Sequence, residues 1–188
     1  LMLTTDISHP DVEEFILMKQ EAAKVLNANV SVKISDAFMQ AVHDDAEFNL
    51  EWRGNVYKTV RAKSLWDKIL NSAYKCAEPG VLFWDKVMER PHGFYPGARP
   101  VTTNPCSEIP LPDDDVCLLT SIYLPYFVKN PYTDEAYFDY DEFKKVVQYG
   151  IEFLDIVKDY DIRMVPSEAI KQQSIDWRRI GLGTHGLG

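Results

Sequence analysis

The sequence predicts an α/β fold, in which strands and helices alternate along the chain as part of a barrel or an open sheet. Apolar residues at helical spacing alternate with short β-branched segments, each pair about one strand–helix unit long. No internal repeat, low-complexity tract or flexible linker interrupts this pattern. The length of 188 residues fits one modest domain, so we expect no second domain. The pattern alone does not decide between the barrel and the sheet.

Three helices, two strands and a hairpin are expected in the first half. Strands are predicted from alternating β-branched residues, and helices from periodic apolar residues that follow a Ser or Asp cap. The hairpin rests on the turn pair Gly54-Asn55. In chain order, the expected elements are a helix after 9–11, a strand over 29–34, a helix from Ser35, a hairpin of 48–52 with 56–60, a helix from Ser64 that ends before Pro79-Gly80, and a strand over 80–84.

The second half is expected to contain a long loop, a strand and the longest helix. The loop spans 90–112, which is rich in Pro and Gly, and a strand is predicted over 117–128. Asp139 and Glu142 form a capping-box pattern for a helix from Asp141 to about Tyr160. A shorter helix and an apolar, Gly-rich run that resembles the start of a strand follow. Because both ends are apolar, we expect an internal fragment of a longer chain.

Composition excludes several classes of function. The formal net charge of −9 argues against binding to duplex nucleic acid. No apolar run is long enough to span a bilayer, and no secretory signal opens the chain, so no membrane partner is expected. Three cysteines without a C-x-x-C pair predict a reducing, intracellular location. His9, His43 and His92 are scattered, so we expect no protein-bound metal.

The segment 104–108 is the strongest candidate for a catalytic site. It places a thiol, Cys106, two positions from the amide of Asn104 and two positions from the carboxylate of Glu108. If the segment is extended, as Pro105 favours, the three side chains lie on one side of the backbone. A nucleophile or radical carrier between a hydrogen-bonding amide and a general base suits catalysis. A loop with a buried structural cysteine is an equally good interpretation of the spacing alone.

The other cysteines and the glycine-rich end carry weaker signals. Cys117 follows Cys106 by eleven residues, which is too wide for a zinc knuckle but allows a redox partnership. A small buried hydrophobe in a strand is the simpler interpretation of Cys117. Cys76, near the end of a helix, is expected to have a packing role. The glycines around His185 lack the spacing of a dinucleotide loop, and packing is their more natural role.

Several segments together resemble the large, catalytic subunit of ribonucleotide reductase. In that family, an N-x-C-x-E finger loop lies at the centre of a ten-stranded α/β barrel, and Asn104 to Leu111 is similar to this loop. The similarity follows the family's order and covers nearly the whole chain. The matching segments are 1–16, 29–39, 78–83, 104–111 and 178–183. The resemblance implies that residues 1–188 are part of such a catalytic barrel.

The resemblance also implies a role for each residue of the loop. Cys106 would carry a thiyl radical that abstracts the 3′-hydrogen of a ribonucleotide. Glu108 would act as general base on the 3′-hydroxyl, and Asn104 would hydrogen-bond the substrate hydroxyls. Cys117 would be one of two cysteines that are oxidised to a disulfide, with its partner outside this chain. The family's usual polar residue after this cysteine is replaced here by Leu118.

Cofactors and partners follow from the same resemblance. The short separation of Cys106 and Cys117 is most similar to the adenosylcobalamin-dependent class; otherwise the radical would come from a separate dimetal subunit. The implied partners are a ribonucleoside di- or triphosphate, a thioredoxin or glutaredoxin-type reductant, and the remaining parts of the reductase chain, with a homodimer as one arrangement. The implied location is the cytoplasm.

Two other functions are consistent with the sequence. The chain could be a non-catalytic assembly piece, a split or degenerate part of a barrel that needs another polypeptide. It could also be a thiol-based redox or binding module of another fold, in which Cys106 and Cys117 form a disulfide. Under each of these hypotheses we expect the isolated chain to be inactive as a reductase.

Overall fold

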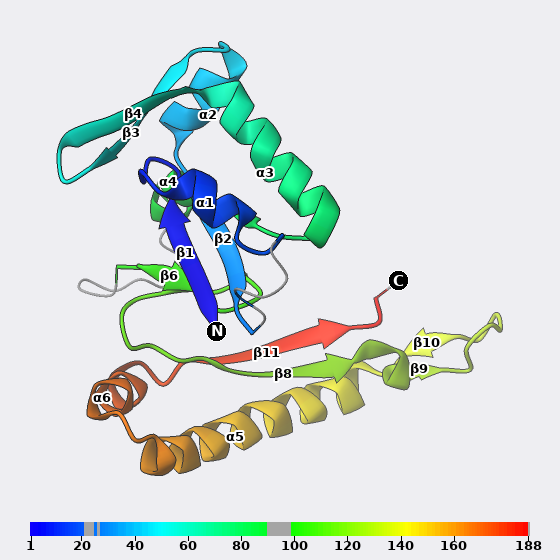
Figure 1. Ribbon diagram of the computed structural model, residues 1–188. Helices are drawn as coiled ribbons and strands as arrows, with labels where there is room; N and C mark the ends of the chain where they lie inside the picture. The colour runs from blue at the N-terminus through cyan, green and yellow to red at the C-terminus, as the bar shows by residue number, and fades with distance from the viewer. Residues whose placement is uncertain (21–24, 26, 90–98, 188) are drawn as a thin grey trace. The chain divides into compact units, whose positions relative to one another are not determined.

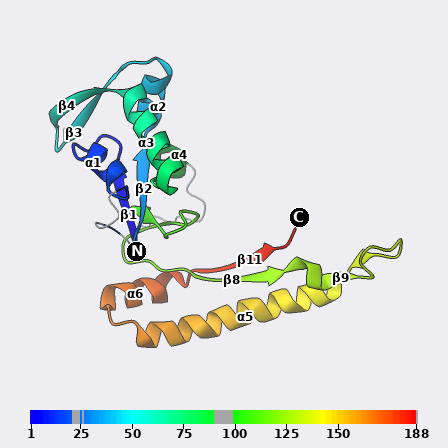
Figure 2. The same cartoon turned by 45° about the vertical axis from the view of Figure 1, so that its right-hand side comes forward.

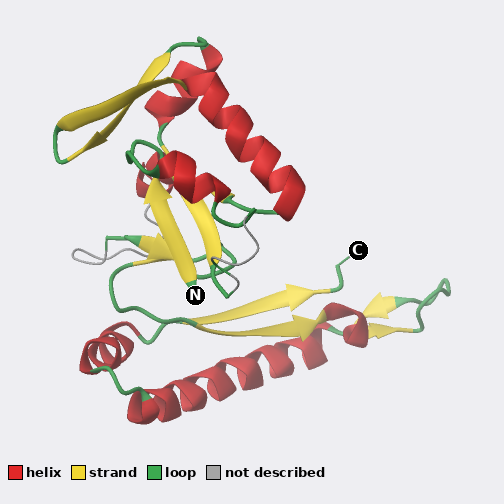
Figure 3. Cartoon of the chain, viewed as in Figure 1, coloured by secondary structure: helices red, strands yellow, loops and turns green. Residues whose placement is uncertain are grey.

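The computed structural model describes residues 1–20, 25, 27–89 and 99–187, which form two compact units, Leu1–Asp113 and Asp114–Gly188. Figures 1 and 2 show the chain from two directions, and Figure 3 distinguishes its helices from its strands. Among the described helices, none combines the length and the apolar character needed to cross a lipid bilayer.

The first unit is built on a three-stranded parallel sheet. The strands β1 (Met2–Asp6), β2 (Asn29–Ile34) and β5 (Gly80–Phe83) lie in the order β1-β2-β5. β2 is central, with Met2 paired to Asn29 on one side and Ser31 paired to Gly80 on the other. Parallel neighbours require crossover connections, and helices supply them here. These are α1 (Val12–Leu17), α2 (Asp36–His43) and α3 (Ala62–Cys76), and α4 (Trp84–Glu89) follows β5.

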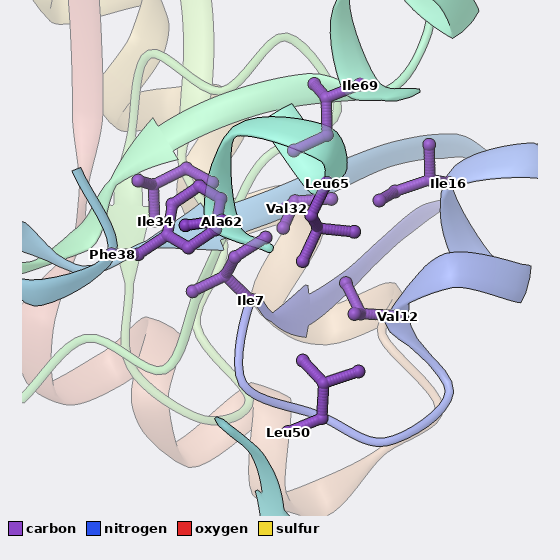
Figure 4. Packing of buried hydrophobic residues seen from close by; sticks show 10 residues of the cluster. All are labelled: Ile7, Val12, Ile16, Val32, Ile34, Phe38, Leu50, Ala62, Leu65 and Ile69. Atoms are coloured by element: carbon purple, nitrogen blue, oxygen red, sulfur yellow. The ribbon is translucent and has the colours of Figure 1, made fainter. Parts of the chain in front are cut away.

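The core of the first unit lies where these helices meet the central strand. Val32 and Ile34 of β2 are at most 1 % exposed, and Phe38 of α2 is fully buried. Burial of one such side chain contributes about 1.5–3 kcal/mol to folding. Figure 4 shows ten side chains of this cluster: Ile7, Val12, Ile16, Val32, Ile34, Phe38, Leu50, Ala62, Leu65 and Ile69. The cluster holds the carboxyl ends of the parallel strands against their helices.

Two hairpins complete the first unit. β3 (Glu47–Trp52) and β4 (Asn55–Arg61) are antiparallel, and the two residues between them, Arg53 and Gly54, both have positive φ. Positive φ at both residues gives the backbone twist that two-residue hairpin loops require. The turn therefore lies one residue earlier than the predicted pair Gly54-Asn55. β6 (Thr102–Thr103) pairs with β7 (Pro110–Leu111) around the segment that carries Cys106.

The second unit contains one parallel strand pair covered by a long helix. β8 (Leu118–Tyr123) pairs with β11 (Ile180–His185), from Leu118↔Ile180 to Tyr123↔His185. The crossover between them contains α5 (Tyr140–Met164), which packs on both strands, and α6 (Glu168–Trp177). A 3-10 helix, η1 (Leu124–Phe127), leads to the short antiparallel pair of β9 (Val128–Lys129) and β10 (Tyr137–Phe138).

The predicted α/β class is confirmed, and most of the predicted elements exist with shifted ends. The described strands form separate sheets and no closed barrel, so the partial barrel and the single domain over 1–188 stay predictions. The single strand expected over 117–128 is wrong over 124–127, where a 3-10 helix separates β8 from β9. Pro125 lies in the 3-10 turn there, because proline has no N–H to donate to a strand ladder. Trp84 begins α4 instead of ending a strand.

Asp139 caps α5 as expected, and replacement of its side chain should lower the free energy of unfolding. Its carboxylate accepts a hydrogen bond from the Glu142 N–H at 3.0 Å, whereas the Glu142 carboxylate binds Lys129 at 2.8 Å instead of closing the capping box. We expect Asp139→Ala to lower the free energy of unfolding by about 1 kcal/mol. Urea denaturation measures this, with the exposed Asp141→Ala as the matched control in the same helical turn. Equal loss in both variants would contradict the capping role.

Candidate functional site

The strands β6 and β7 close a six-residue loop that contains all three predicted catalytic side chains. Asn104 closes the loop twice, since its N–H donates to the Ile109 carbonyl at 3.2 Å and its side-chain Oδ1 accepts from the Ile109 N–H at 3.0 Å. Below it, Thr102 pairs with Leu111 and Thr103 with Pro110. The loop is therefore fixed at its base by backbone pairing and by one amide side chain.

A tight turn at the tip of the loop presents Cys106. The Asn104 carbonyl accepts a hydrogen bond from the Ser107 N–H at 2.9 Å, with Pro105 and Cys106 at the centre of the turn. Proline suits the first central position because its φ is already fixed. Ser107 then adopts a positive φ of 71°. The expectation of an extended segment is wrong, because this turn interrupts the alternation on which it relied.

The turn leaves the chemically active groups of the loop accessible. Cys106 is an exposed thiol, and Glu108 is exposed as well. Because Oδ1 of Asn104 is used for the loop, its Nδ2 group is the part that remains to bind a ligand. Within the described ranges Nδ2 makes no hydrogen bond to protein. The loop thus offers one thiol, one carboxylate and one amide donor within five residues.

Cys117 lies in the second unit, directly before β8. It is half-buried, and its Sγ is 3.9 Å from the Leu118 carbonyl oxygen. A Cβ atom built on Gly181 of β11 would lie 3.9 Å from the same Sγ, so the thiol is next to the neighbouring strand. None of the three cysteines, all of them described, forms a disulfide. Since Cys106 and Cys117 lie in different units, their partnership in one site stays a prediction.

Buried charges surround the segment before Cys117. The fully buried Asp115 carboxylate accepts a charged hydrogen bond from Nε of Arg179. Lys158 of α5 is 0 % exposed, and its Nζ donates to the Val116 carbonyl at 3.0 Å. Burial lowers the pKa of Lys158 below the usual lysine value.

Sequence reasoning missed Lys158, because a lysine is expected on the solvent side of an amphipathic helix. Apolar residues recur at helical spacing along α5, yet its buried residues are Leu154 and Lys158, and Ile151 is 43 % exposed. The spacing of four residues between Leu154 and Lys158 was the available signal, since it places both side chains on one helix face.

The remaining candidate residues, Cys76 and His185, make hydrogen-bond contacts within the fold. The Cys76 thiol donates to the Ser72 carbonyl at 3.2 Å and to the Glu78 carbonyl at 3.3 Å, which supports a packing role at the end of α3. His185 contacts Ser121, with 3.1 Å between Nδ1 and Oγ. Across the described ranges, no three His, Cys, Asp or Glu side chains form a metal-binding group. His92 lies outside the described residues, and the absence of a metal from this chain stays a prediction.

Comparison with known proteins gives a consistent result. A family model described as "Ribonucleotide reductase, barrel domain" matches residues 1–188. A vitamin B12-dependent ribonucleoside-diphosphate reductase of Thermoplasma acidophilum is 35 % identical over 183 residues, which cover 96 % of this chain and 23 % of the relative. A vitamin B12-dependent ribonucleotide reductase of Streptomyces coelicolor is 32 % identical over 212 residues, covering 100 % of this chain and 22 % of the relative.

A third similar protein agrees with these two. The vitamin B12-dependent ribonucleoside-diphosphate reductase of Mycobacterium tuberculosis strain H37Rv is 31 % identical over 189 residues, covering 99 % of this chain and 26 % of the relative. The chain therefore spans about a quarter of the length of the curated relatives it matches.

Proposed function

This chain belongs to the ribonucleotide reductase barrel family, and on that premise we propose that it forms part of the catalytic site of an enzyme that reduces ribonucleotides to 2′-deoxyribonucleotides. The observation that carries the proposal is the loop 104–109, which presents an exposed Cys106 at the tip of a turn. A radical carrier must reach both its radical source and its substrate, and an exposed tip provides that access.

The three side chains of the loop then have separate tasks. The Cys106 thiyl radical takes the 3′-hydrogen atom of the ribose and becomes a thiol, and it returns a hydrogen atom to the 3′ carbon after the reduction, which regenerates the thiyl radical. Glu108 accepts the proton of the 3′-hydroxyl, and its exposed carboxylate is accessible to a substrate. Asn104 donates through Nδ2 to a substrate hydroxyl, while its Oδ1 keeps the loop closed. The same amide therefore shapes the loop and binds the substrate.

Cys117 supplies electrons in the second half of the reaction. The 2′-hydroxyl leaves as water. The two electrons that this reduction requires come from Cys117 and a second cysteine outside this chain. The two thiols become one disulfide, and their hydrogens are transferred to the product and to the water that leaves. A dithiol of the thioredoxin or glutaredoxin type then restores both thiols.

Adenosylcobalamin is the radical source that we propose, because the relatives compared above are named as vitamin B12-dependent. The exposed Cys106 fits this source, since a large cofactor can approach a thiol at the tip of a turn. When bound, the cofactor would supply the radical chemistry that converts the Cys106 thiol into a thiyl radical. Within this chain, the turn around Cys106 holds the sulfur at the surface of the loop.

A full-length reductase that contains this chain tests the proposal directly. We expect deoxyribonucleotide to form from a ribonucleoside di- or triphosphate when adenosylcobalamin and a dithiol are present, and not when either is omitted. Chromatography of the nucleotides measures the product. Product that forms without adenosylcobalamin but with a separate dimetal subunit would contradict the proposed radical source. No product with either source would instead favour the non-catalytic assembly piece. A cytoplasmic location is part of this proposal.

A further inference from the structure

Lys158 is a charged side chain in a place where charge is costly. It is 0 % exposed, and a lysine transferred from water to such a site loses its hydration unless protein groups replace it. One replacement is the Val116 carbonyl, which accepts a hydrogen bond from Nζ at 3.0 Å. Val116 is the residue directly before Cys117. The side chain of α5 thus ties the helix to the backbone that carries the candidate redox thiol.

The charged groups that face Lys158 come from three elements. Asp115 lies before β8, Asp161 lies on α5, and Arg178 lies at the end of α6. The Asp115 carboxylate is already held by Arg179. Arg178 is likewise held by two α5 carboxylates, at 2.6 Å from Asp155 and 2.7 Å from Asp159.

Cys117 is a further titratable group near this lysine. The Nζ of Lys158 lies 3.0 Å from the carbonyl oxygen of the residue before Cys117, and a negative charge on the Cys117 sulfur would raise the pKa of Lys158. Burial acts in the opposite direction and is the larger influence on the pKa of Lys158. A thiolate on Cys117 would therefore offset part of the free-energy cost of burying the Lys158 ammonium.

We propose that Lys158 is a positioning residue for Cys117, which fixes the backbone before the thiol and supplies the positive charge that stabilises its thiolate. The inference rests on the proposed function, because it assigns the thiolate a step in that reaction. A dithiol reductant attacks the partner sulfur of the disulfide, and a new sulfur–sulfur bond forms there. The Cys117–partner bond breaks, and its electron pair leaves on Cys117.

The second sulfur of the reductant then completes the exchange. It closes the disulfide of the reductant and releases the partner cysteine as a thiolate. The two protons of the reductant pass to Cys117 and its partner, so two electrons and two protons are transferred in all. A leaving thiolate that is stabilised departs faster, and a buried ammonium beside it provides that stabilisation.

The experiment measures the rate at which iodoacetamide alkylates Cys117 against pH, by mass spectrometry of the Cys117 peptide from the full-length reduced protein. Lys158→Gln removes the charge and keeps a hydrogen-bond donor for the Val116 carbonyl. We expect the midpoint of the pH profile of Lys158→Gln to lie about one pH unit above that of the wild type. Alkylation of Cys117 at pH 7 should then be about tenfold slower. Lys145→Met, at an exposed position on the same helix, is the matched control and should leave the profile unchanged.

A Lys158→Gln profile that coincides with the wild-type profile overturns the proposal, because the donor is retained and only the charge is lost. If Lys158→Gln does not fold, the pH profile of Cys117 alkylation in the wild-type protein tests the proposal instead. A midpoint below the ordinary thiol value of about 8.5 supports the inference, and a midpoint at or above it overturns the inference. Alkylation needs neither nucleotide nor cofactor, so it can be read even if the wild-type protein reduces no nucleotide, which would refute the proposed function alone.

Discussion

Cys106→Ser in the full-length reductase abolishes deoxyribonucleotide formation, with an expected loss of at least about 10⁴-fold. This corresponds to about 5.5 kcal/mol, at roughly 1.36 kcal/mol for each factor of ten. The cause is chemical, since the O–H bond of serine is stronger than the S–H bond of cysteine and a serine oxygen does not serve as the radical carrier. The measurement is steady-state product formation together with nucleotide affinity, which should change less than about threefold.

The local structure makes this substitution specific. The turn is held by Pro105, by the hydrogen bond from Ser107 to Asn104 and by the contacts of Asn104 with Ile109, and none of these uses the sulfur of Cys106. Serine is close in size and suits a turn. Cys76→Ser is the matched control, because its new hydroxyl can still donate to the backbone carbonyls at the end of α3. Turnover that survives in Cys106→Ser would refute the assignment of the radical carrier.

Local sequence signals predicted most of the fold. Alternating β-branched residues identified β2, and Val30, Val32 and Ile34 are all buried because alternate residues of a strand lie on the same face. Asp139 predicted the start of α5 within one residue because a cap side chain acts on its own helix. Such elements are determined by neighbours in sequence, and a single chain therefore reveals them.

The geometry of the loop could not be predicted in the same way. The residue types at 104, 106 and 108 mark a possible site in the sequence, but their arrangement depends on the pairing of β6 with β7. That pairing lets Oδ1 of Asn104 bind the Ile109 N–H and favours a turn over an extended segment. Competition between a side chain and the backbone for one N–H is decided by tertiary contacts, which no spacing rule contains.

Lys158 illustrates a second limit of the sequence. A polar residue inside a helix is assigned to solvent unless its partner is known, and here the partner is the carbonyl of Val116, 42 residues earlier in the chain. The cost of burying the ammonium is offset only by groups that the fold brings to it. A buried charge of this kind is therefore visible in the structure alone.

Cys117→Ser separates the redox interpretation of this thiol from the structural one. Abstraction of the 3′-hydrogen uses Cys106 and not Cys117, so a substrate labelled with tritium at the 3′ carbon should still release label to water, within about tenfold of the wild-type rate. Deoxyribonucleotide formation should fall by at least about 10³-fold, because the electrons for loss of the 2′-hydroxyl are missing. A small buried hydrophobe would behave differently, since its loss would lower stability and affect both readouts in parallel. Full product formation by Cys117→Ser would show that the second unit contributes a strand and a packing residue, and that the reductant cysteines lie elsewhere.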